Sequence, residues 1–373
     1  MKVALVHDWL NQYGGAERVL EEFHALFPEA PVYVSMYAPE KMPADYRSWD
    51  IRTSWMQRLP LVTKKHQPFM PLYPVAFESF DLSGYDLVLS SASAFCHGVL
   101  TRPETCHVCY CHTPTRFMWN YFDYVKRESL GTNQQRALVP LLFNLRTWDR
   151  VSADRVDYWI ANSRLVRQRI AKFYRRTSEV IHPPVSADRF RTSDGFDDYY
   201  LVLSRLIPYK RIDLAVQACS RIGARLVVAG SGRETDRLKK MAGPSVEFVG
   251  RVDDDAMVDL YARCKAFLFP GEEDFGITPL EAMASGRPVI AYSSGGVLDT
   301  VVPGETGEFF TEQTVDSLAA ALTSFRPDAY DPMAIRAHAE TFDASVFRQR
   351  IMEFVMARLA DYRAGIPTQG CGM

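Results

Sequence analysis

Acidic and glycine residues that could bind a charged ligand lie in the stretch GEEDFGITPLEAMASG, residues 271–286. Three consecutive acids, 272–274, separate the apolar run 266–270 from a predicted short helix that contains Glu281. A helix N-terminus attracts anions, so these acids could simply complement the helix dipole. Alternatively, the acids and the first helical amides bind different parts of one ligand.

The segment TPLE, residues 278–281, fits a capping box in which Thr278 is the N-cap and Glu281 lies at the third helical position. Glu281 therefore has a structural interpretation. Glu273 lies before the predicted helix, where a capping acid would be only loosely placed, so ligand binding is the better hypothesis for it. Its two neighbouring acids have only the dipole explanation.

Two cations follow the apolar run 199–206. Arg205 and Lys210 lie five residues apart in the loop SRLIPYKRID. This pair suits a diphosphate, because arginine binds it as a fork and lysine as a point charge. The alternative is solvated surface charge. Gly230, in the GSG that ends the next apolar run, permits close approach of the backbone.

Gly14 and Gly15 follow the first apolar run and precede a predicted helix. Such a turn can bring backbone amides close to a phosphate, although it can also be only a turn and a helix start. The fingerprint GxGxxG is absent here, which counts against a nicotinamide-dependent enzyme.

Cysteines and histidines are concentrated in HVCYCHTP, residues 107–114. On a strand, Cys109 and Cys111 would point to one face and His112 to the other. The spacing matches no tetrahedral zinc pattern, so we predict no metal site. His112 ends the strand, where ligands bind in parallel sheets. It is a candidate site residue, and a core or capping histidine is the alternative.

Three aspartates, 253–255, resemble the DxD metal motif of some sugar-nucleotide enzymes. They directly precede a predicted helix, so N-capping and dipole complementation explain them better. Metal is not expected here either.

The composition is that of a folded protein, with 47% hydrophobic and 24% charged residues among 373. A net charge of −2 gives no basic field for nucleic acid. The seven cysteines form no disulfide-framework pattern, which favours a reducing compartment. Neither a signal peptide nor a run of about 18–20 apolar residues is present, so we expect a cytoplasmic protein, soluble or attached to a membrane surface.

The elements that must position these residues are short strands alternating with helices, typical of doubly wound α/β sheets. Helices are expected at 211–223 and 254–264. Length and the turn-rich stretch 182–198 predict two domains. The expected strands are 2–9, 31–38, 86–93, 107–114, 158–164, 199–206, 224–232, 246–252, 266–271 and 288–296.

We expect domain boundaries of 1–190 and 191–345, with a C-terminal helix at about 345–365 that could pack back on the first domain. Two facing sheets would place a ligand in the cleft between them. Residues 55–74 mix aromatic, apolar and basic side chains, which suits either an anionic lipid surface or an ordinary segment packed within the first domain.

Together and in this order, the GG loop, SRLIPYK and EDFGITPLEAMASG resemble the retaining glycosyltransferases of family 4, which have the GT-B fold. That fold is two Rossmann-like doubly wound parallel-sheet domains facing a central cleft. HDWLNQYGGAERV and CHTPTRFMW further resemble the bacterial mannosyltransferase-like branch of O-antigen and exopolysaccharide synthesis.

The resemblance implies a role for each candidate residue. Arg205 and Lys210 would neutralise the diphosphate of a nucleotide sugar, and Gly14 and Gly15 would close over it from the other domain. Glu273 would accept hydrogen bonds from sugar hydroxyls. The amides of Phe275, Gly276 and Ile277 would face the phosphate and the sugar, and Glu281 would hold the ribose hydroxyls. Arg251 and Val252 would border the base, and Gly230 is a further donor-site residue. His112 would lie near the transferred sugar and the acceptor.

The implied reaction moves a hexose from a nucleotide sugar to a glycan or lipid-linked glycan, with GDP-mannose as the first donor and UDP-glucose as the second. No metal or other cofactor is required, because cations already face the leaving diphosphate. The rivals are a glucosyltransferase of the same fold, a nucleotide-sugar-binding protein without turnover, and a phosphorylase-like enzyme with a pyridoxal lysine.

Overall fold

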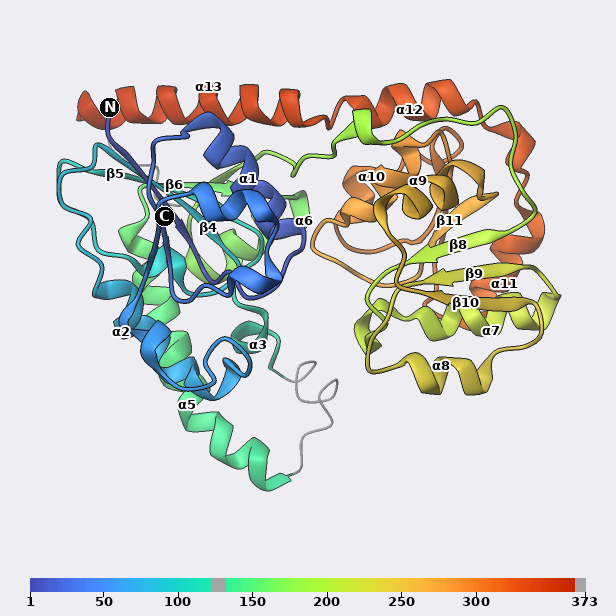
Figure 1. The fold of residues 1–373 in the computed structure, drawn as a ribbon, viewed down its shortest axis with the longest axis horizontal. Coiled ribbons are helices and arrows are strands. Elements are labelled where there is room, and N and C mark those ends of the chain that lie inside the picture. The colour runs from blue at the N-terminus through green and yellow to red at the C-terminus, as the bar shows by residue number, and fades with distance from the viewer. Residues whose placement is uncertain (122–131, 366–373) are drawn as a thin grey trace. The chain divides into compact units, whose positions relative to one another are not determined.

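Two parallel β-sheets form the framework of the chain, one in each of two compact units (Figure 1). The computed structural model describes residues 1–121 and 132–365. Every expected strand range overlaps an observed strand, which confirms the doubly wound α/β class. The first sheet contains β1 Val3–His7, β2 Val32–Val34, β3 Ile51–Thr53, β4 Leu87–Ala92, β5 Cys106–Cys111, β6 Tyr158–Ala161 and β7 Ser178–Val180.

The second sheet contains β8 Tyr200–Leu203, β9 Leu226–Ala229, β10 Val246–Gly250, β11 Ala266–Phe269, β12 Val289–Tyr292 and β13 Gly307–Phe310. Its strand order is β10-β9-β8-β11-β12-β13, and that of the first sheet is β3-β2-β1-β4-β5-β6-β7. The order reverses between β1 and β4 in one sheet and between β8 and β11 in the other. These reversals are where open parallel sheets bind ligands, outside the carboxyl ends of the strands.

The sequence missed three strands, β3, β7 and β13. Each is only three or four residues long and lies at the edge of its sheet. An edge strand is covered less completely than a central one, so it needs no continuous apolar run. The pattern used to find the central strands is therefore absent from these three.

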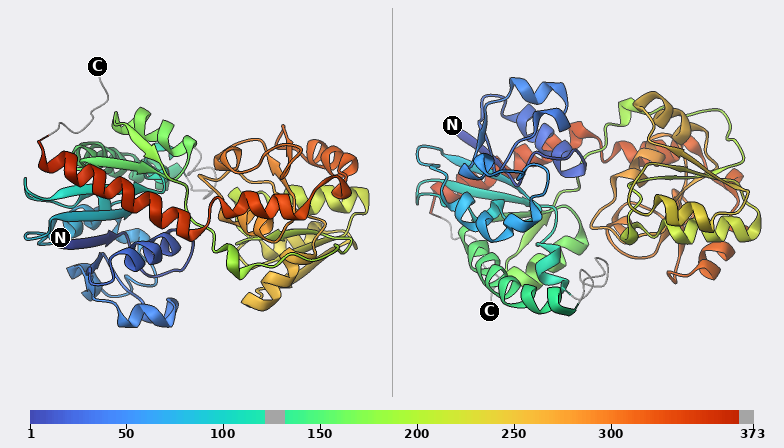
Figure 2. Two further views of the ribbon diagram at one scale, coloured as in Figure 1. Left: turned by 90° about the horizontal axis from the view of Figure 1, so that it is seen from above. Right: turned by 60° about the horizontal axis from the view of Figure 1, so that its bottom comes forward.

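Helices cover both faces of the first sheet. One face packs against α1 Gly15–Leu26 and α13 Ala344–Arg363, and α13 lies alongside this sheet (Figure 1, Figure 2). The other packs against α2 Tyr73–Glu78, α5 Thr132–Ser152 and α6 Arg164–Arg169. The short helix α3, Arg116–Trp119, follows β5. The α13 contacts join the C-terminal helix to the first unit, which comprises residues up to His182 and from Phe347.

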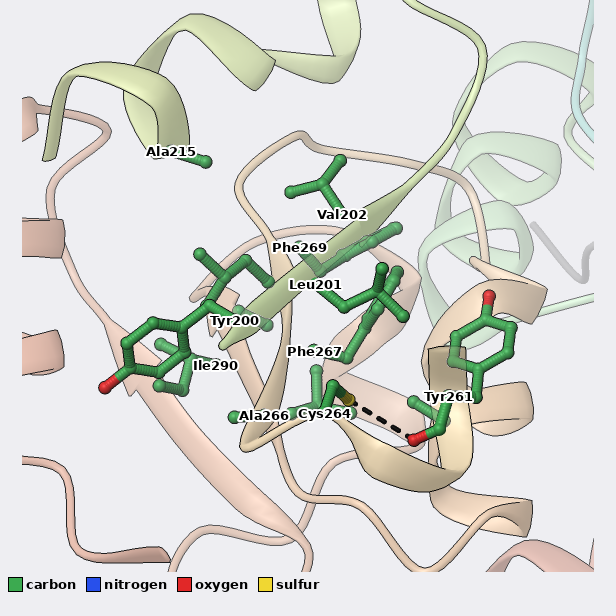
Figure 3. Packing of buried hydrophobic residues seen from close by; sticks show 14 of the residues in the cluster. Tyr200, Leu201, Val202, Ala215, Tyr261, Cys264, Ala266, Phe267, Phe269 and Ile290 are labelled. Atoms are coloured by element: carbon green, nitrogen blue, oxygen red, sulfur yellow. Dashed lines mark hydrogen bonds between the residues drawn. The ribbon is translucent and has the colours of Figure 1, made fainter. Parts of the chain in front are cut away.

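A single apolar core fills the second unit, Pro183–Val346. Its helices are α7 Ile212–Ile222, α8 Thr235–Met241, α9 Asp254–Arg263, α10 Ile277–Ala284, α11 Val315–Ser324 and α12 Pro332–Glu340. Figure 3 shows part of this core, where Tyr261 of α9 lies beside Phe267 of β11 with ring centroids 5.5 Å apart.

The units divide at residue 182, whereas the sequence placed the domain boundary at 190. The intervening segment packs with the second unit. Val185 and Phe190 lie in its core, and the Val185 amide donates to the Phe342 carbonyl. These apolar residues are spaced irregularly among turn formers, so periodicity did not reveal them.

Most apolar side chains of residues 55–74 are packed within the first unit. Met56 and Tyr73 are fully buried, and Phe69 and Met70 pack against the same core. Trp55 and Leu61 are exposed, at 38% and 65% of their surface. No helix within the described residues is long and apolar enough to cross a membrane.

The six cysteines inside the described residues are free and buried, and Cys371 lies outside them. Beside them, the fully buried His107 meets the Ser90 hydroxyl, with Nε2 2.8 Å from Oγ. Burial lowers the pKa of His107 to about 3.

We expect His107 to make the first unit acid-sensitive. Its folded pKa lies below its unfolded value, so below about pH 6.5 the unfolded chain binds the extra proton and stability falls toward pH 3. This histidine alone should remove about 2 kcal/mol between pH 7 and pH 5. All six tryptophans lie between residues 9 and 159, so their fluorescence reports the first unit. Denaturant unfolding of wild type and His107→Gln at both pH values measures the effect, and an equal pH dependence in the two proteins would contradict it.

Candidate functional site

Lys210 and Glu273 meet at the reversal of strand order in the second sheet. Lys210 ends a 3₁₀ turn, Pro208–Lys210, that follows β8, and Glu273 follows β11, the neighbouring strand. The Lys210 ammonium forms an ion pair with the Glu273 carboxylate. Both side chains are about 15% exposed, so the pair is mostly buried but still reaches solvent.

Close backbone packing explains why these two loops meet. A Cβ on Gly271 would lie only 2.9 Å from the Lys210 Cα and from the Tyr209 carbonyl oxygen, so only glycine permits this approach. Gln313 ties the loops together from one side, since its amide nitrogen donates to the Pro270 carbonyl and its oxygen accepts from Arg211. Sequence reasoning did not identify Gln313, because its neighbours carry no motif.

The predicted capping box is wrong. Helix α10 begins at Ile277, one residue before the expected cap, and its N-cap is Gly276, with φ of 91° and no side-chain cap. Thr278 and Pro279 therefore lie within the first turn. The first amides of any helix lack partners inside that helix, so α10 presents N–H groups and the positive end of its dipole beside Glu273.

Glu281 lies in a different environment from the capping box that the sequence predicted. It lies beyond the first turn of α10 and is only 3% exposed, and its carboxylate accepts a hydrogen bond of 2.9 Å from the Tyr261 hydroxyl of α9. This bond joins α10 to α9 within the core. Ribose binding by Glu281 stays a prediction.

The neighbouring acids have partners beyond the helix dipole. Glu272 accepts a 2.8 Å hydrogen bond from Ser294, and the Glu273 carbonyl accepts one of 2.9 Å from the Gly296 amide. Ser294 and Gly296 belong to the SSGG turn after β12. This turn holds the Glu273 loop in place. The sequence showed the two glycines, but nothing in the spacing assigned them to this loop.

The remaining donor-site candidates lie around the same edge of the sheet. Arg205 is exposed after β8. Gly230, with φ of 125°, approaches the Ser204 carbonyl, where a Cβ would lie 1.9 Å from the oxygen, so its close contact is with the chain itself. After β10, Arg251 Nε donates to Ser231 Oγ at 2.9 Å.

The Phe275 side chain is buried in the core, so only its backbone can face a ligand, whereas Val252 is partly buried and packs against the core. Asp253 caps α9, with its carboxylate accepting from the Ala256 amide at 2.9 Å, which confirms the capping interpretation of the aspartate run.

In the first unit, the glycine turn after β1 begins α1 as expected. Gly14 is the N-cap and Gly15 the first helical residue. Glu17 of the first turn is buried, and one of its carboxylate oxygens lies 3.4 Å from the position a Gly14 Cβ would take. This carboxylate occupies part of the helix N-terminus that was expected to attract a phosphate.

His112 is half-buried directly after β5, at the carboxyl edge of the first sheet. Its amide donates to the Ala92 carbonyl and its carbonyl accepts from Asn162, at 2.8 and 2.9 Å. The Nε2 atom lies 2.8 Å from Ser91 Oγ. Cys109 and Cys111 belong to the core on the other side of the sheet.

Asp8 is a second buried acid after β1 that sequence reasoning passed over. Its two carboxylate oxygens accept hydrogen bonds of 2.6–2.8 Å from the amides of Ser93, Ala94, Phe95 and Cys96. It thereby shapes the whole turn after β4. An acid next to a histidine at a strand end was the only available signal.

Comparison with known proteins covers nearly the whole chain. Residues 13–189 match the model of Glycosyltransferase Family 4, and residues 187–340 match that of glycosyl transferases group 1. A GDP-mannose-dependent monoacylated alpha-(1-6)-phosphatidylinositol monomannoside mannosyltransferase of Corynebacterium glutamicum is 33% identical over 180 residues. That alignment covers 42% of this chain and 47% of the relative, so the chain spans about half the length of this relative.

The human alpha-1,3/1,6-mannosyltransferase ALG2 is 25% identical over 92% of both chains. Among solved structures, Anabaena HepE in complex with UDP matches with a TM-score of 0.71 and 19% identity. That match covers 96% of this chain and all of the HepE chain, and it shows a shared fold.

Proposed function

The chain belongs to the glycosyltransferases of family 4, with the GT-B fold, and on that premise we propose that it transfers mannose from GDP-mannose to a glycan or lipid-linked glycan. The ion pair of Lys210 and Glu273 at the reversal of strand order supports this proposal most strongly. The GDP-mannose dependence of the named relative supports the choice of donor. The resemblance to enzymes of O-antigen and exopolysaccharide synthesis supports the acceptor class.

The pair suits a nucleotide sugar chemically. An ammonium carries three N–H donors, so Lys210 can keep its contact with Glu273 and still bind a phosphate oxygen. An ionised Glu273 only accepts hydrogen bonds, as sugar hydroxyls require. Arg205 and the first amides of α10 supply further positive charge beside the same edge.

Bond cleavage between the sugar and the diphosphate leaves negative charge on the leaving oxygen. Fixed cations and amides stabilise such charge most strongly in a water-poor site. Lys210 and Arg205 supply this stabilising positive charge without a metal ion. Asp253 already caps helix α9. We therefore propose metal-independent transfer. Retention of the anomeric configuration would follow from attack on the face that the phosphate leaves, with the phosphate assisting deprotonation of the acceptor.

A donor screen tests the proposal. A ligand that binds only the folded protein stabilises it by about 2.7 kcal/mol at 100 times its Kd. We expect GDP-mannose to raise the melting temperature more than UDP-glucose or ADP-glucose, with or without EDTA. A larger shift with UDP-glucose would identify a glucosyltransferase. Binding without release of nucleoside diphosphate, when a lipid-linked acceptor is present, would identify a protein without turnover.

We also propose that the protein acts at the cytoplasmic face of a membrane, through the exposed part of residues 55–74. Trp55 and Leu61 are exposed there together with Arg58, Lys64 and Lys65. Aromatic and basic side chains of this kind bind anionic lipid, and each cation contributes about 1 kcal/mol near such a surface. An acceptor carried on a lipid would be reached from this position.

Co-sedimentation with phosphatidylglycerol vesicles at low salt measures this contact. We expect the protein to bind them, and the double variant Lys64→Gln/Lys65→Gln to bind on the order of tenfold more weakly. The matched control is Lys239→Gln/Lys240→Gln, which removes two adjacent exposed lysines from α8. Equal partition of all three proteins, or no binding at all, would contradict the proposal.

A further inference from the structure

A line of polar side chains crosses three neighbouring strands at the carboxyl edge of the first sheet. His7 ends β1, Ser91 lies near the end of β4, and His112 follows β5. His7 and Ser91 are paired in register, and Ser91 is paired with Tyr110, two residues before His112. Because alternate residues of a strand share a face, all three side chains lie on the face covered by α1.

The contacts along this line are continuous. His112 Nε2 lies 2.8 Å from Ser91 Oγ, and Ser91 Oγ lies 3.2 Å from His7 Nδ1. On the far side of the His7 ring, Nε2 lies 3.6 Å from a carboxylate oxygen of Glu17. His7, Ser91 and Glu17 are all at least 95% buried, whereas His112 is half-buried.

The Glu17 carboxylate determines which atom donates and which accepts in each hydrogen bond along this line. A neutral imidazole has one N–H and one lone pair, and a carboxylate attracts the N–H and repels the lone pair. Glu17 therefore favours the hydrogen on Nε2 of His7, which leaves Nδ1 to accept from the Ser91 hydroxyl. The Ser91 oxygen then accepts from Nε2–H of His112, and Nδ1 of His112 becomes the acceptor.

We propose that Glu17, acting through His7 and Ser91, holds His112 in the Nε2–H tautomer, so that its Nδ1 accepts a hydrogen bond from a hydroxyl of the transferred hexose or of the acceptor. This inference rests on the proposed glycosyl transfer for its purpose but not for its geometry. Glu17, His7 and Ser91 are positioning residues. They act on the sugar through His112, and fixing its tautomer in advance avoids reorganisation when substrate binds.

Variants of two neighbouring serines distinguish a positioning role of Ser91 from a contribution to the stability of the fold alone. Ser91→Ala removes the bond to His112, and Ser90→Ala removes an equivalent buried bond of 2.8 Å, to His107 on the other face of the same strand. We expect Ser91→Ala to lower kcat at least about tenfold with a smaller change in KM, because His112 is then no longer held in advance in the tautomer that binds the hydroxyl. Ser90→Ala should leave kcat within about twofold, and Ser91→Thr, which keeps the hydroxyl, should recover part of the loss.

Nitrogen NMR of histidine-labelled enzyme without substrate tests the tautomer directly. The His112 signals are assigned by their loss in His112→Asn. In wild type we expect a protonated Nε2 and an unprotonated Nδ1, and in Glu17→Gln a shift toward the opposite tautomer. An Nδ1–H tautomer in wild type, or the same His112 signals in Glu17→Gln, would overturn the inference. Because this measurement needs no donor, it stays decisive even if the enzyme transfers a sugar other than mannose or none.

Discussion

Replacing Lys210 by alanine is expected to reduce sugar transfer on the order of a thousandfold while leaving the second unit folded. Loss of one preorganised group that stabilises transition-state charge typically costs a hundredfold to a thousandfold in kcat. Lys210 also keeps part of its side chain exposed beside Glu273 and does not belong to the apolar core, so its removal deletes no core side chain. Release of nucleoside diphosphate with a lipid-linked acceptor measures the rate, and thermal unfolding measures the fold.

Glu273→Ala should have an effect of similar size, because it removes the acceptor of sugar hydroxyls and the partner of Lys210. The double variant Lys210→Met/Glu273→Gln asks whether the ion pair is only structural. A structural pair can often be replaced by neutral side chains without loss, whereas two groups that bind substrate cannot. We expect the double variant to remain inactive.

The matched control for Lys210 is Lys265→Ala. Lys265 also forms an ion pair, with Asp198 at 3.2 Å, but it precedes β11 and so lies at the amino end of the same strand. This variant should retain near-normal transfer. Near-normal transfer in Lys210→Ala, or recovery in the double variant, would show that the candidate site is wrongly placed.

Asp8→Asn is expected to destabilise the first unit by about 3–5 kcal/mol. The wild-type carboxylate accepts four buried backbone N–H groups. An asparagine offers one acceptor oxygen, and its NH₂ group would face two amide donors that have lost their partner. Buried donors without acceptors each cost about 1–3 kcal/mol.

Denaturant unfolding followed by tryptophan fluorescence measures this loss, since every tryptophan belongs to the first unit. Asp45→Asn, which makes the same change at an exposed aspartate of that unit, provides the control and should alter stability by less than about 0.5 kcal/mol. Equal free energies of unfolding for the two variants would show that the four hydrogen bonds of Asp8 contribute little to stability.

The central strands could be predicted because a strand covered on both faces must be apolar along its whole length. That requirement leaves a local signal at β1, β4, β8 and β11. The edge strands β3 and β7 leave none. Residues 55–74 left two interpretations open, a lipid-binding surface or a segment packed within the first domain, because burial cannot be read from their composition, and Met56 and Tyr73 are core residues.

The capping prediction failed at α10 for a physical reason. TPLE has the composition of a capping box, yet Gly276 begins the helix because it can adopt a φ of 91°, which the other residues of the stretch disfavour. The two acids therefore differ in burial and in partners rather than in their place relative to a capping box. Glu273 is partly exposed beside Lys210, and Glu281 is buried and bonded to Tyr261.

The sequence by itself determined the two doubly wound sheets and the loops that carry Lys210, Glu273, Gly14 and His112, because each follows an apolar run on the same chain segment. Only the tertiary structure decided which side chains meet. Lys210 and Glu273 are 63 residues apart, His7 and Ser91 are 84 apart, and Asp8 reaches a turn 85 to 88 residues away. Strand order and register bring these residues together, and neither leaves a trace in local spacing.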